Sequence, residues 1–372
     1  MAKYKLKELC EFITDGTHQT PEYCGNDGVI FLSSKDVTER KINWDSVKYI
    51  PNALHEKLCK RLKPRKNDIL LAKNGTTGVA AIVDRDEIFD VYVSLAVLRP
   101  LNVVYPKYLL YAINSPVVKR QFDAGLKGVG VPNLHLGVIK ETWINVVKKE
   151  GQQKVCKVLD KIEKIIELKK QELQLLDELI KARFVEMFGN PVTNEKRWKQ
   201  KLLGEITTKI GSGATPKGGK SAYQENGITL IRSMNVHNGM FEYKELAHIS
   251  DEQATKLDNV ALEEKDVLLN ITGASVARSC VVPSKILPAR VNQHVCIIRC
   301  KECIIPEFLN KLLIDDNYQE LLWSIAGAGA TREAITKQQV EGLQIIMPPV
   351  ALQNEFMRFC KQVDKSKVVH YI

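Results

Sequence analysis

The chain has 372 residues, of which 44% are hydrophobic and 26% are charged, and its formal net charge is +10 at pH 7. This length and composition predict two globular domains with cores of their own and argue against a disordered chain. The basic excess suits a polyanionic partner, although basic charge alone is weak evidence for nucleic-acid binding.

The sequence gives no sign of export. Its start, MAKYKLKELCEF, lacks an apolar signal core, and no stretch approaches the roughly 18 apolar residues that a membrane span needs. We therefore expect a cytoplasmic protein without a membrane partner. Its nine cysteines, an odd number, are then expected to be reduced and to form no disulfide framework.

The first 150 residues are repeated in residues 200–350 with the same order of segments. KLKELCEFITDGTHQTP aligns with KLLGEITTKIGSGATP, and GVIFLSSKDV aligns with GITLIRSMNV. KNDILLAKNGTTGVAAIV aligns with EKDVLLNITGASVARSCVV, which pairs Asp68 with Asp266. Because the repeat is so long, it indicates a duplicated domain rather than a solenoid of short repeats.

Each copy predicts the same elements in chain order. A short amphipathic start and a polar Thr/Gly/Pro loop lead to a strand, FLSS or LIRS, and then to a helical stretch, NALHEKLCKRL or DEQATKLDNVAL. A strand pair with glycine turns follows around DILLAKNG or DVLLNITG, and VSLAVLRP or HVCIIRC alternates as a further strand. PKYLLYAIN and PEFLNKLLI place a proline at a plausible first helical position. Each copy is therefore predicted to be a mixed α/β domain.

Helices with apolar seams are predicted after each copy. Residues 152–188 have apolar side chains at alternating steps of three and four, typical of a coiled coil, and such a helix would be roughly 55 Å long. A shorter copy of this seam precedes the C-terminus. Two seams in one chain favour their pairing with each other over packing on a globular domain or homodimerisation. The predicted seam comprises Val155, Leu159, Ile162, Ile166, Leu173, Leu176, Ile180, Leu352, Phe356, Phe359 and Val363.

Two motifs suggest chemistry but fit it poorly. GSGATPKGGKSAY resembles a phosphate-binding loop, but Ala214 occupies a required glycine position and Pro216 removes a backbone donor. Cys296, Cys300 and Cys303 have the C-x3-C-x2-C spacing of radical-SAM iron–sulfur enzymes. The first copy has no cysteine at the corresponding positions, and the segment alternates like a strand, so core cysteines are the favoured interpretation.

No catalytic centre emerges from the remaining motifs. There is no HExxH or paired-histidine metal spacing, no G-x-S-x-G elbow and no convincing nuclease carboxylate cluster. We therefore expect a non-catalytic protein that binds neither a metal nor a cofactor.

Two sets of polar loops remain as candidate DNA-binding elements. Lys and Arg can neutralise phosphates, and Arg, Asn, Gln and Ser can read base edges in the major groove. The sets match in position but differ in side chains, as recognition of two different short sequences requires. The candidates are Thr17, His18, Gln19, Ser33, Ser34, Lys35, Lys73, Asn74, Thr76 and Thr77 in the first copy, and Lys217, Lys220, Ser221, Arg232, Ser233, Asn235, His237, Thr272, Ser275 and Arg278 in the second.

With its two T-P loops, its repeated D-[IV]-L-L strand, the AGAGATREAI segment before QIIMPPVALQNEF, and QQKVCKVLDKIEKIIELKKQ, the chain resembles the specificity (S) subunit of type I restriction-modification systems. These features span nearly the whole length. The resemblance implies a mixed α/β fold with two duplicated globular target recognition domains, separated by long helices that form an antiparallel coiled coil. The expected organisation is target recognition domain 1 (1–150), a central conserved helix (151–190), target recognition domain 2 (191–350) and a short C-terminal conserved helix (351–372).

The resemblance also implies a function. Each domain would read one half of a bipartite, asymmetric site in double-stranded DNA, and the helices would set the spacing and dock two methyltransferase (M) subunits. Restriction/translocase (R) subunits would complete the complex. S-adenosylmethionine, ATP and Mg are then expected on these partners. The alternatives are a non-catalytic coiled-coil scaffold and the radical-SAM enzyme described above.

Overall fold

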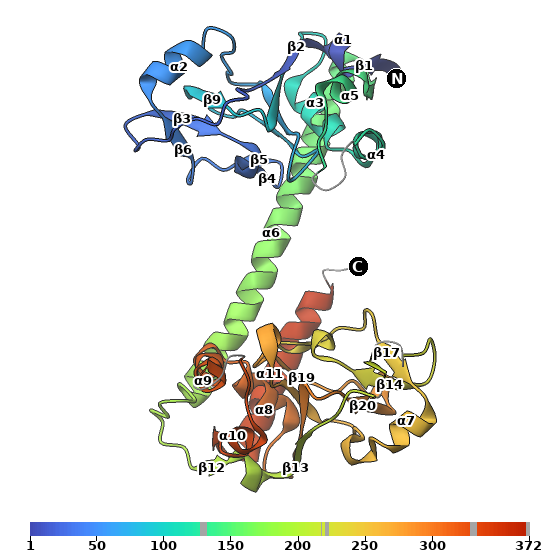
Figure 1. The fold of residues 1–372 in the computed structure, drawn as a ribbon. Coiled ribbons are helices and arrows are strands. Elements are labelled where there is room, and N and C mark those ends of the chain that lie inside the picture. Colours follow the sequence, from blue (N-terminus) through green and yellow to red (C-terminus); the bar gives the residue numbers. More distant parts are fainter. Residues whose placement is uncertain (127–131, 217, 220–222, 328–332, 370–372) are drawn as a thin grey trace. The chain divides into compact units, whose positions relative to one another are not determined.

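The computed structural model contains two compact units (Figure 1). Unit 1 comprises Met1–Glu167 and unit 2 comprises Leu168–Ile372. Their division falls inside one helix, α6 (Lys149–Phe188), so each unit includes part of it. The structure describes residues 1–126, 132–216, 218–219, 223–327 and 333–369.

Unit 1 is built on two sheets. A four-stranded antiparallel sheet has the order β2-β10-β7-β8. A three-stranded sheet has the order β6-β3-β9, in which β3 and β9 run parallel. The ladders β1-β11 and β4-β5 accompany them. The strands are β1 (Ala2–Lys5), β2 (Cys10–Asp15), β3 (Val29–Leu32), β4 (Val37–Thr38), β5 (Lys41–Ile42), β6 (Lys48–Ile50), β7 (Ile69–Ala72), β8 (Ala80–Ile82), β9 (Phe89–Val91), β10 (Leu95–Pro100) and β11 (Trp143–Val146).

Strand β7 lies between the two apolar cores of unit 1. Ile69 and Leu71 pack in a core with helix α3, whereas Leu70 and Ala72 pack in a core with the three-stranded sheet. Burial on both faces explains why ILLA is a continuous apolar run rather than an alternating one. The helices of unit 1 before α6 are α1 (Leu6–Leu9), α2 (Asn52–Leu58), α3 (Pro106–Ile113), α4 (Pro116–Ala124) and α5 (Leu136–Glu141).

Unit 2 repeats the topology of unit 1, which confirms the predicted duplication. Its four-stranded sheet has the order β13-β21-β18-β19, and its three-stranded sheet has the order β17-β14-β20 with β14 and β20 parallel. The ladders β12-β22 and β15-β16 again accompany them. The strands are β12 (Gln200–Leu202), β13 (Thr207–Ser212), β14 (Ile228–Ile231), β15 (Val236–His237), β16 (Met240–Phe241), β17 (Ala247–Ile249), β18 (Val267–Asn270), β19 (Ser279–Val281), β20 (Ala289–Val291), β21 (Val295–Cys300) and β22 (Gln344–Ile346); the helices are α7 (Asp251–Thr255), α8 (Pro306–Leu313), α9 (Asp316–Gly327), α10 (Lys337–Glu341) and α11 (Val350–Val369).

Helices α6 and α11 begin in the same way. The buried Gln152 accepts a hydrogen bond from the Tyr105 N–H at 2.7 Å and donates to the Val147 carbonyl at 3.0 Å. The buried Gln353 accepts from the Ile305 N–H at 2.9 Å and donates to a carbonyl at its own helix start, 2.9 Å away. Each glutamine therefore ties the first turn of its helix to the loop before α3 or α8, and α11 is structurally a second copy of the start of α6.

Within unit 2, the end of α6 and α11 pack antiparallel. Asp177 pairs with Lys367 at 2.6 Å, and Arg183 pairs with Glu355 at 3.2 Å, so the residue numbers run in opposite directions. Phe184 of α6 is buried in the same apolar core as Phe356 of α11. This contact confirms the predicted pairing of the two seams inside one chain.

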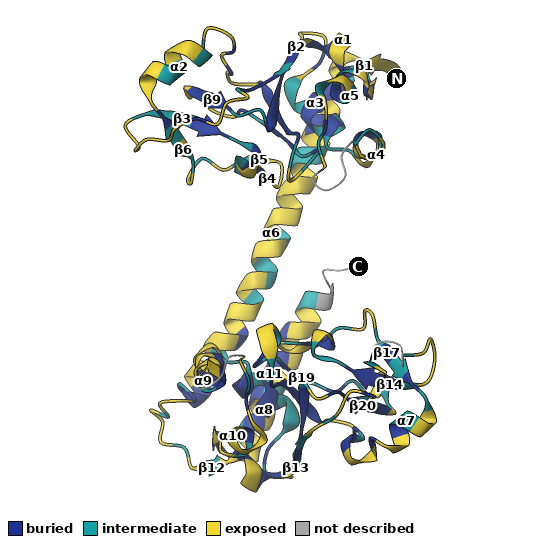
Figure 2. Ribbon diagram, viewed as in Figure 1, coloured by how far each residue is buried: buried dark blue, intermediate teal, exposed yellow. Residues whose placement is uncertain are grey.

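The predicted seam residues on α6 and α11 differ in how far they are buried. In unit 2, Ile180, Phe356 and Val363 are buried, and Leu173, Leu176, Leu352 and Phe359 are half-buried. In unit 1, Leu159 is half-buried, while Val155, Ile162 and Ile166 are exposed (Figure 2). The middle of α6 therefore carries an apolar surface that the described residues leave uncovered. None of the described helices combines the length and apolar character that a membrane span requires.

The three spaced cysteines lie at the core of unit 2. Cys296 is buried in β21, and Cys300 and Cys303 pack against the same core. Burial raises the pKa of Cys296 and of Cys300 to about 12, which favours the protonated thiol over the thiolate that an iron–sulfur cluster needs. Among the described residues, no group of three His, Cys, Asp or Glu side chains could hold a metal ion.

Candidate nucleic-acid interface

Four loops meet at one end of the four-stranded sheet in each unit. They are the T-P loop (16–28 in unit 1; 213–216, 218–219 and 223–227 in unit 2), the turn after the next strand (33–36, 232–235), the glycine loop (73–78, 271–277) and the turn before the following strand (92–94, 292–294). We call the last of these the central turn. The polar candidates from the sequence lie on the first three loops, and no candidate was predicted on the central turn.

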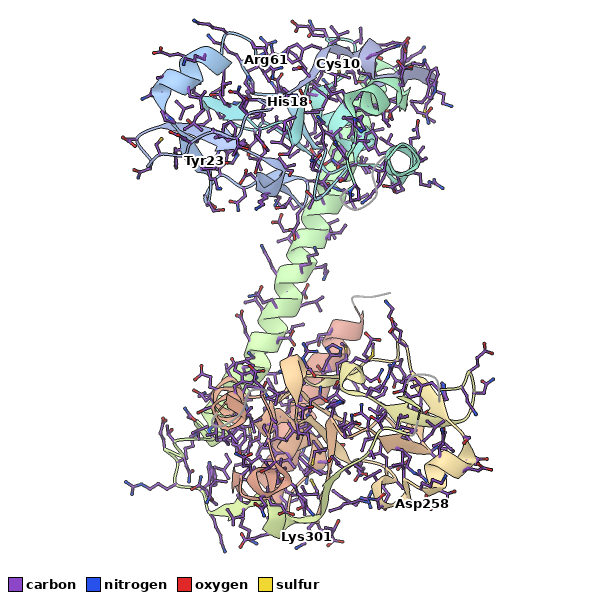
Figure 3. The ribbon with its side chains drawn as sticks, viewed as in Figure 1. Cys10, His18, Tyr23, Arg61, Asp258 and Lys301 are labelled. Atoms are coloured by element: carbon purple, nitrogen blue, oxygen red, sulfur yellow. The ribbon has the colours of Figure 1, made fainter. Side chains whose placement is uncertain are left out.

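Glycine lets the T-P loop approach the backbone before the central turn. A Cβ atom on Gly16 would lie 1.8 Å from the Val91 carbonyl oxygen, and a Cβ atom on Gly213 would lie 1.7 Å from that of Val291. Only glycine permits such a contact. In unit 1, Arg61 also donates to the carbonyl of Asp15 at 2.6 Å (Figure 3). The T-P loop is thus held in place at its first residues.

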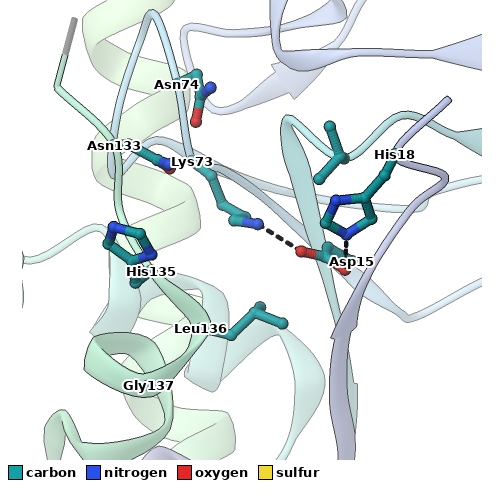
Figure 4. Close-up of a pocket in the computed structure, with 9 residues that line it drawn as sticks. Asp15, His18, Lys73, Asn74, Asn133, His135, Leu136 and Gly137 are labelled. Carbon is teal, nitrogen blue, oxygen red and sulfur yellow. Dashed lines mark hydrogen bonds and ion pairs between the residues drawn. The ribbon is translucent and has the colours of Figure 1, made fainter. Parts of the chain in front are cut away.

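A cleft of about 490 Å³ opens between the T-P loop, the glycine loop and the start of α5 in unit 1. On one wall, the buried Lys73 Nζ lies 2.5 Å from Asp15 Oδ2 (Figure 4). The exposed His18 approaches the other oxygen of Asp15, with Nε2 3.5 Å from Oδ1. The remaining lining residues are Asn74, Val93, Asn133, His135, Leu136 and Gly137. Since Asp15 neutralises Lys73, this lysine orients the carboxylate rather than offering a free charge to a phosphate.

A second cleft of unit 1, of about 480 Å³, lies on the other side of the central turn. The Lys48 ammonium group lies 4.1 Å from the centre of the exposed Tyr23 ring, in cation–π contact. The predicted residues Ser33, Ser34 and Lys35 line this cleft with Phe31, Asp36, Ser46, Tyr92 and Ser94. Aromatic faces, hydroxyl groups and lysines are the groups that contact bases and phosphates in nucleic-acid complexes.

In unit 2, Tyr223 corresponds to Tyr23 and also has a cation over its ring. The Arg232 guanidinium lies 5.5 Å from the centre of the Tyr223 ring, and its Nη2 donates to the Glu245 carbonyl. Arg232 occupies the position of Ser33, whereas the cation in unit 1 comes from a different strand. The two units therefore build a similar feature from different side chains.

A chain of hydrogen bonds joins three loops of unit 2. The Thr215 hydroxyl donates to Gln293 Oε1, and Gln293 Nε2 lies 3.0 Å from Nε2 of His294. His294 Nδ1 lies 2.5 Å from the Thr272 hydroxyl. Because an amide nitrogen can only donate, His294 Nε2 accepts and Nδ1 carries the proton that is donated to Thr272. The side chain of Gln293 is exposed, yet this chain holds it in one orientation.

Several predicted residues are accessible on these loops. Thr17 and Asn74 are half-buried, and His18, Gln19, Lys35 and Thr76 are exposed. Thr77, Arg232, Ser233, His237, Thr272, Ser275 and Arg278 are half-buried. Lys217, Lys220 and Ser221 lie outside the described residues.

Three other predicted residues have structural roles that count against DNA contact. Lys73 is buried on Asp15. Ser34 is buried, and its backbone N–H donates to Ser94 Oγ at 3.0 Å. Asn235 is fully buried, and its amide donates to the carbonyls of Glu242 and Lys244 while it accepts from the Arg232 N–H. A polar residue in a loop segment cannot be recognised as buried from the sequence alone, which is why these three were included.

The sequence candidates for this interface did not include Tyr23, Lys48, Gln293 or His294. Tyr23 and Lys48 lie outside the segments that looked most polar, and Gln293 and His294 stand directly before a strand. The one signal available was the alignment of the two copies, in which VYVS faces VNQH with unrelated side chains.

Comparisons with known proteins agree on one family. A family model described as the type I restriction modification DNA specificity domain matches residues 1–178 and 195–369. The type I restriction enzyme MjaIX specificity subunit of Methanocaldococcus jannaschii is 25% identical over 380 residues, which cover 95% of this chain and 84% of that protein. The putative MjaX specificity subunit of the same organism is 20% identical over 379 residues, covering 97% of this chain and 86% of that protein.

Solved structures share the fold. The S subunit of a type I restriction-modification system from M. genitalium aligns with a TM-score of 0.55 and 13% identity, covering all of this chain and 91% of that one. A chain from a structure of type I R-M complex assembly and conformational transition aligns with a TM-score of 0.59 and 18% identity, covering 99% and 91%. Because the family model matches both halves of a chain whose two units repeat one fold, this protein belongs to the family of type I restriction-modification specificity subunits.

Proposed function

We propose that each unit of this specificity subunit reads one half of a bipartite, asymmetric site in double-stranded DNA through its four loops. The observation that carries the proposal is the duplicated scaffold with different side chains at matching loop positions. Ser33 is replaced by Arg232, Asn74 by Thr272, and Ser94 by His294. One backbone that presents two sets of hydrogen-bonding groups suits two unrelated base sequences.

Phosphate contacts are expected to supply much of the affinity. The chain has 54 Lys and Arg residues against 44 Asp and Glu residues. Exposed cations such as Lys35 lie beside the clefts. Release of counterions from DNA then makes the affinity fall steeply with salt concentration.

The exposed apolar side chains of α6 support a docking role for the helix. Within unit 1, Val158, Ile162, Ile165 and Ile166 are each about half exposed or more, which is unusual for side chains of this kind. We propose that the two methyltransferase subunits cover this surface and its continuation through Leu168, Leu175 and Leu179 in unit 2. Restriction/translocase subunits complete the assembly.

This chain contributes recognition and no chemistry of its own. S-adenosylmethionine, ATP and Mg belong, in our proposal, to the methyltransferase and restriction subunits, and the complex acts in the cytoplasm.

The decisive experiment is to sequence modified bases in DNA from cells that produce this chain with the methyltransferase subunit of its own system. We expect one motif with two short specific parts and a non-specific spacer. Arg232→Ala is then expected to relax one part only. Altered preference in both parts, or a motif that has a single part, would contradict the proposal.

A further inference from the structure

Each central turn is bound through its backbone to the other three loops. In unit 1, the Val93 N–H donates to the Thr17 carbonyl at 2.9 Å, and the Lys73 N–H donates to the Ser94 carbonyl at 2.8 Å. The Tyr92 N–H donates to the Leu32 carbonyl at 2.8 Å, just before the turn at 33–36. The central turn is therefore the element through which the T-P loop, the 33–36 turn and the glycine loop are joined.

Unit 2 repeats two of these three backbone bonds, and in the third the T-P loop donates to the central turn instead of accepting from it. The Gly213 N–H donates to the Asn292 carbonyl at 3.1 Å, and the Ile271 N–H donates to the His294 carbonyl at 3.0 Å. The Asn292 N–H donates to the Ile231 carbonyl at 3.0 Å. The scaffold is thus retained, while the side chains change completely, from Tyr-Val-Ser to Asn-Gln-His.

Such an element is well placed to determine specificity. Its side chains can change while these backbone hydrogen bonds remain, because the bonds use no side-chain atom. In unit 1, Val93 lines the first cleft, while Tyr92 and Ser94 line the second, so the turn lies between both clefts. Resting on the proposed function, we propose that the central turns are the specificity-determining centres, and that Gln293 reads a base edge with His294 as its positioning residue.

The hydrogen-bonding capacity of Gln293 defines the base class. A glutamine amide has two N–H groups and an oxygen with two lone pairs. One N–H is used by His294 and one lone pair by Thr215, which leaves one donor and one acceptor on an exposed side chain. This remaining pair matches the N7 acceptor and the N6 donor that adenine presents in the major groove.

The positions of His294 and Thr215 make this reading rigid. An exposed glutamine normally samples many rotamers, and ordering it on binding reduces affinity. The two internal hydrogen bonds hold the amide plane before DNA arrives. Loss of the acceptor at His294 is therefore expected to weaken base discrimination through Gln293 without removing any atom that touches DNA.

The test uses the intact complex of this chain with its methyltransferase subunit, and the readout is the motif found by sequencing modified bases. Gln293→Ala is expected to lower the preference for one A·T base pair in one part of the motif on the order of tenfold. Gln293→Glu, which can only accept, is expected to shift preference at that position toward C·G. His294→Ala is expected to weaken preference at that same position. Gln338→Ala, at an exposed glutamine of α10, is the matched control and should leave the motif unchanged.

The outcomes separate this inference from the proposed function. Suppose that the chain without substitutions yields a two-part motif, but the Gln293 variants change only the amount of DNA modification and no base preference. The assignment of specificity to the central turn is then wrong, and the proposed function stands. A change at different positions for Gln293→Ala and His294→Ala would overturn the positioning role. If the chain without substitutions gives no two-part motif, the proposed function itself is wrong.

Discussion

Arg99 holds Asp68 with two parallel hydrogen bonds, from Nε to Oδ1 at 2.9 Å and from Nη2 to Oδ2 at 2.8 Å. Unit 2 repeats this geometry with Arg299 and Asp266, at 2.8 Å for both bonds. Asp68 is 1% exposed and Asp266 is fully buried. The acidic residue that opens the D-[IV]-L-L strand is thus a buried anion with a dedicated cation in each unit.

Arg99→Ala is expected to destabilise unit 1 by about 3 kcal/mol, because it leaves the buried Asp68 carboxylate without its partner. Chemical denaturation followed by circular dichroism measures the change. Arg85→Ala is the control, since Arg85 and Asp84 form an exposed pair at 3.9 Å that should contribute less than about 1 kcal/mol. Equal losses for the two variants would show that the buried pair has no special role.

Gly213→Ala is expected to displace the T-P loop of unit 2, because its Cβ would lie 1.7 Å from the Val291 carbonyl oxygen. DNA binding should fall at least severalfold while the methyltransferase subunit still co-purifies. Gly211→Ala, two residues earlier, is the matched control, as nothing lies within 4 Å of its Cβ position. Normal DNA binding by Gly213→Ala would mean that the loop position is irrelevant to recognition.

Phe184→Ala is expected to lower the stability of unit 2 by about 3–5 kcal/mol, because the ring is buried between two helices. Its ring centre lies 5.5 Å from that of Phe356 on α11 and 5.1 Å from that of Phe188. Val185→Ala, at an exposed neighbouring position on α6, should change stability by less than about 0.5 kcal/mol. A small effect of Phe184→Ala in urea denaturation would argue against the antiparallel pairing of α6 with α11.

Ile165→Ser is expected to reduce the amount of methyltransferase subunit that co-purifies with this chain, because it removes an exposed apolar side chain from the middle of α6. Lys164→Ser, exposed on a different face of α6, serves as control and should co-purify normally. Size-exclusion chromatography of the mixed subunits gives the ratio. Unchanged association of the Ile165 variant would place the docking surface elsewhere.

The buried thiols are expected to resist alkylation at pH 8. Burial raises the pKa of Cys10, Cys280 and Cys296 from 9.0 to about 12, so these thiols stay protonated at that pH and lack the reactive thiolate. The exposed Cys24 should be labelled first by iodoacetamide, as mass spectrometry can show. Rapid labelling of Cys296 in the folded chain, or iron bound to the purified protein, would revive the iron–sulfur alternative.

The duplication made much of the fold predictable. Strand β7 and strand β18 could be aligned because each has the same aspartate before a run of buried aliphatic residues. The prolines that begin α3 and α8 were recognisable because a first helical position needs no backbone donor. The pairing of the two seams also followed from their apolar periodicity, and its antiparallel direction from the resemblance to specificity subunits.

The side chains of the site were harder to predict. Lys73 and Asn235 look like DNA contacts in a polar loop, but their partners, Asp15 and the carbonyls of 242 and 244, come from elsewhere in the chain. The alignment of the two copies marked the segment of Gln293 as variable, but it could not show how the side chain is oriented, because that depends on Thr215 and His294 across two loops. Local composition identifies a loop, whereas the use of each polar group in it depends on tertiary contacts.

The glutamines in the first turns of α6 and α11 mark two equivalent positions in the chain, which we call joints. Since Gln152 and Gln353 make the same contacts to their own units, a segment ending at one joint can replace a segment ending at the other without disturbing the helix start. Recombination between such segments would create new combinations of recognition halves in a single step. Each exchanged segment would keep its own loop framework, because the contacts of its glutamine lie within its own unit.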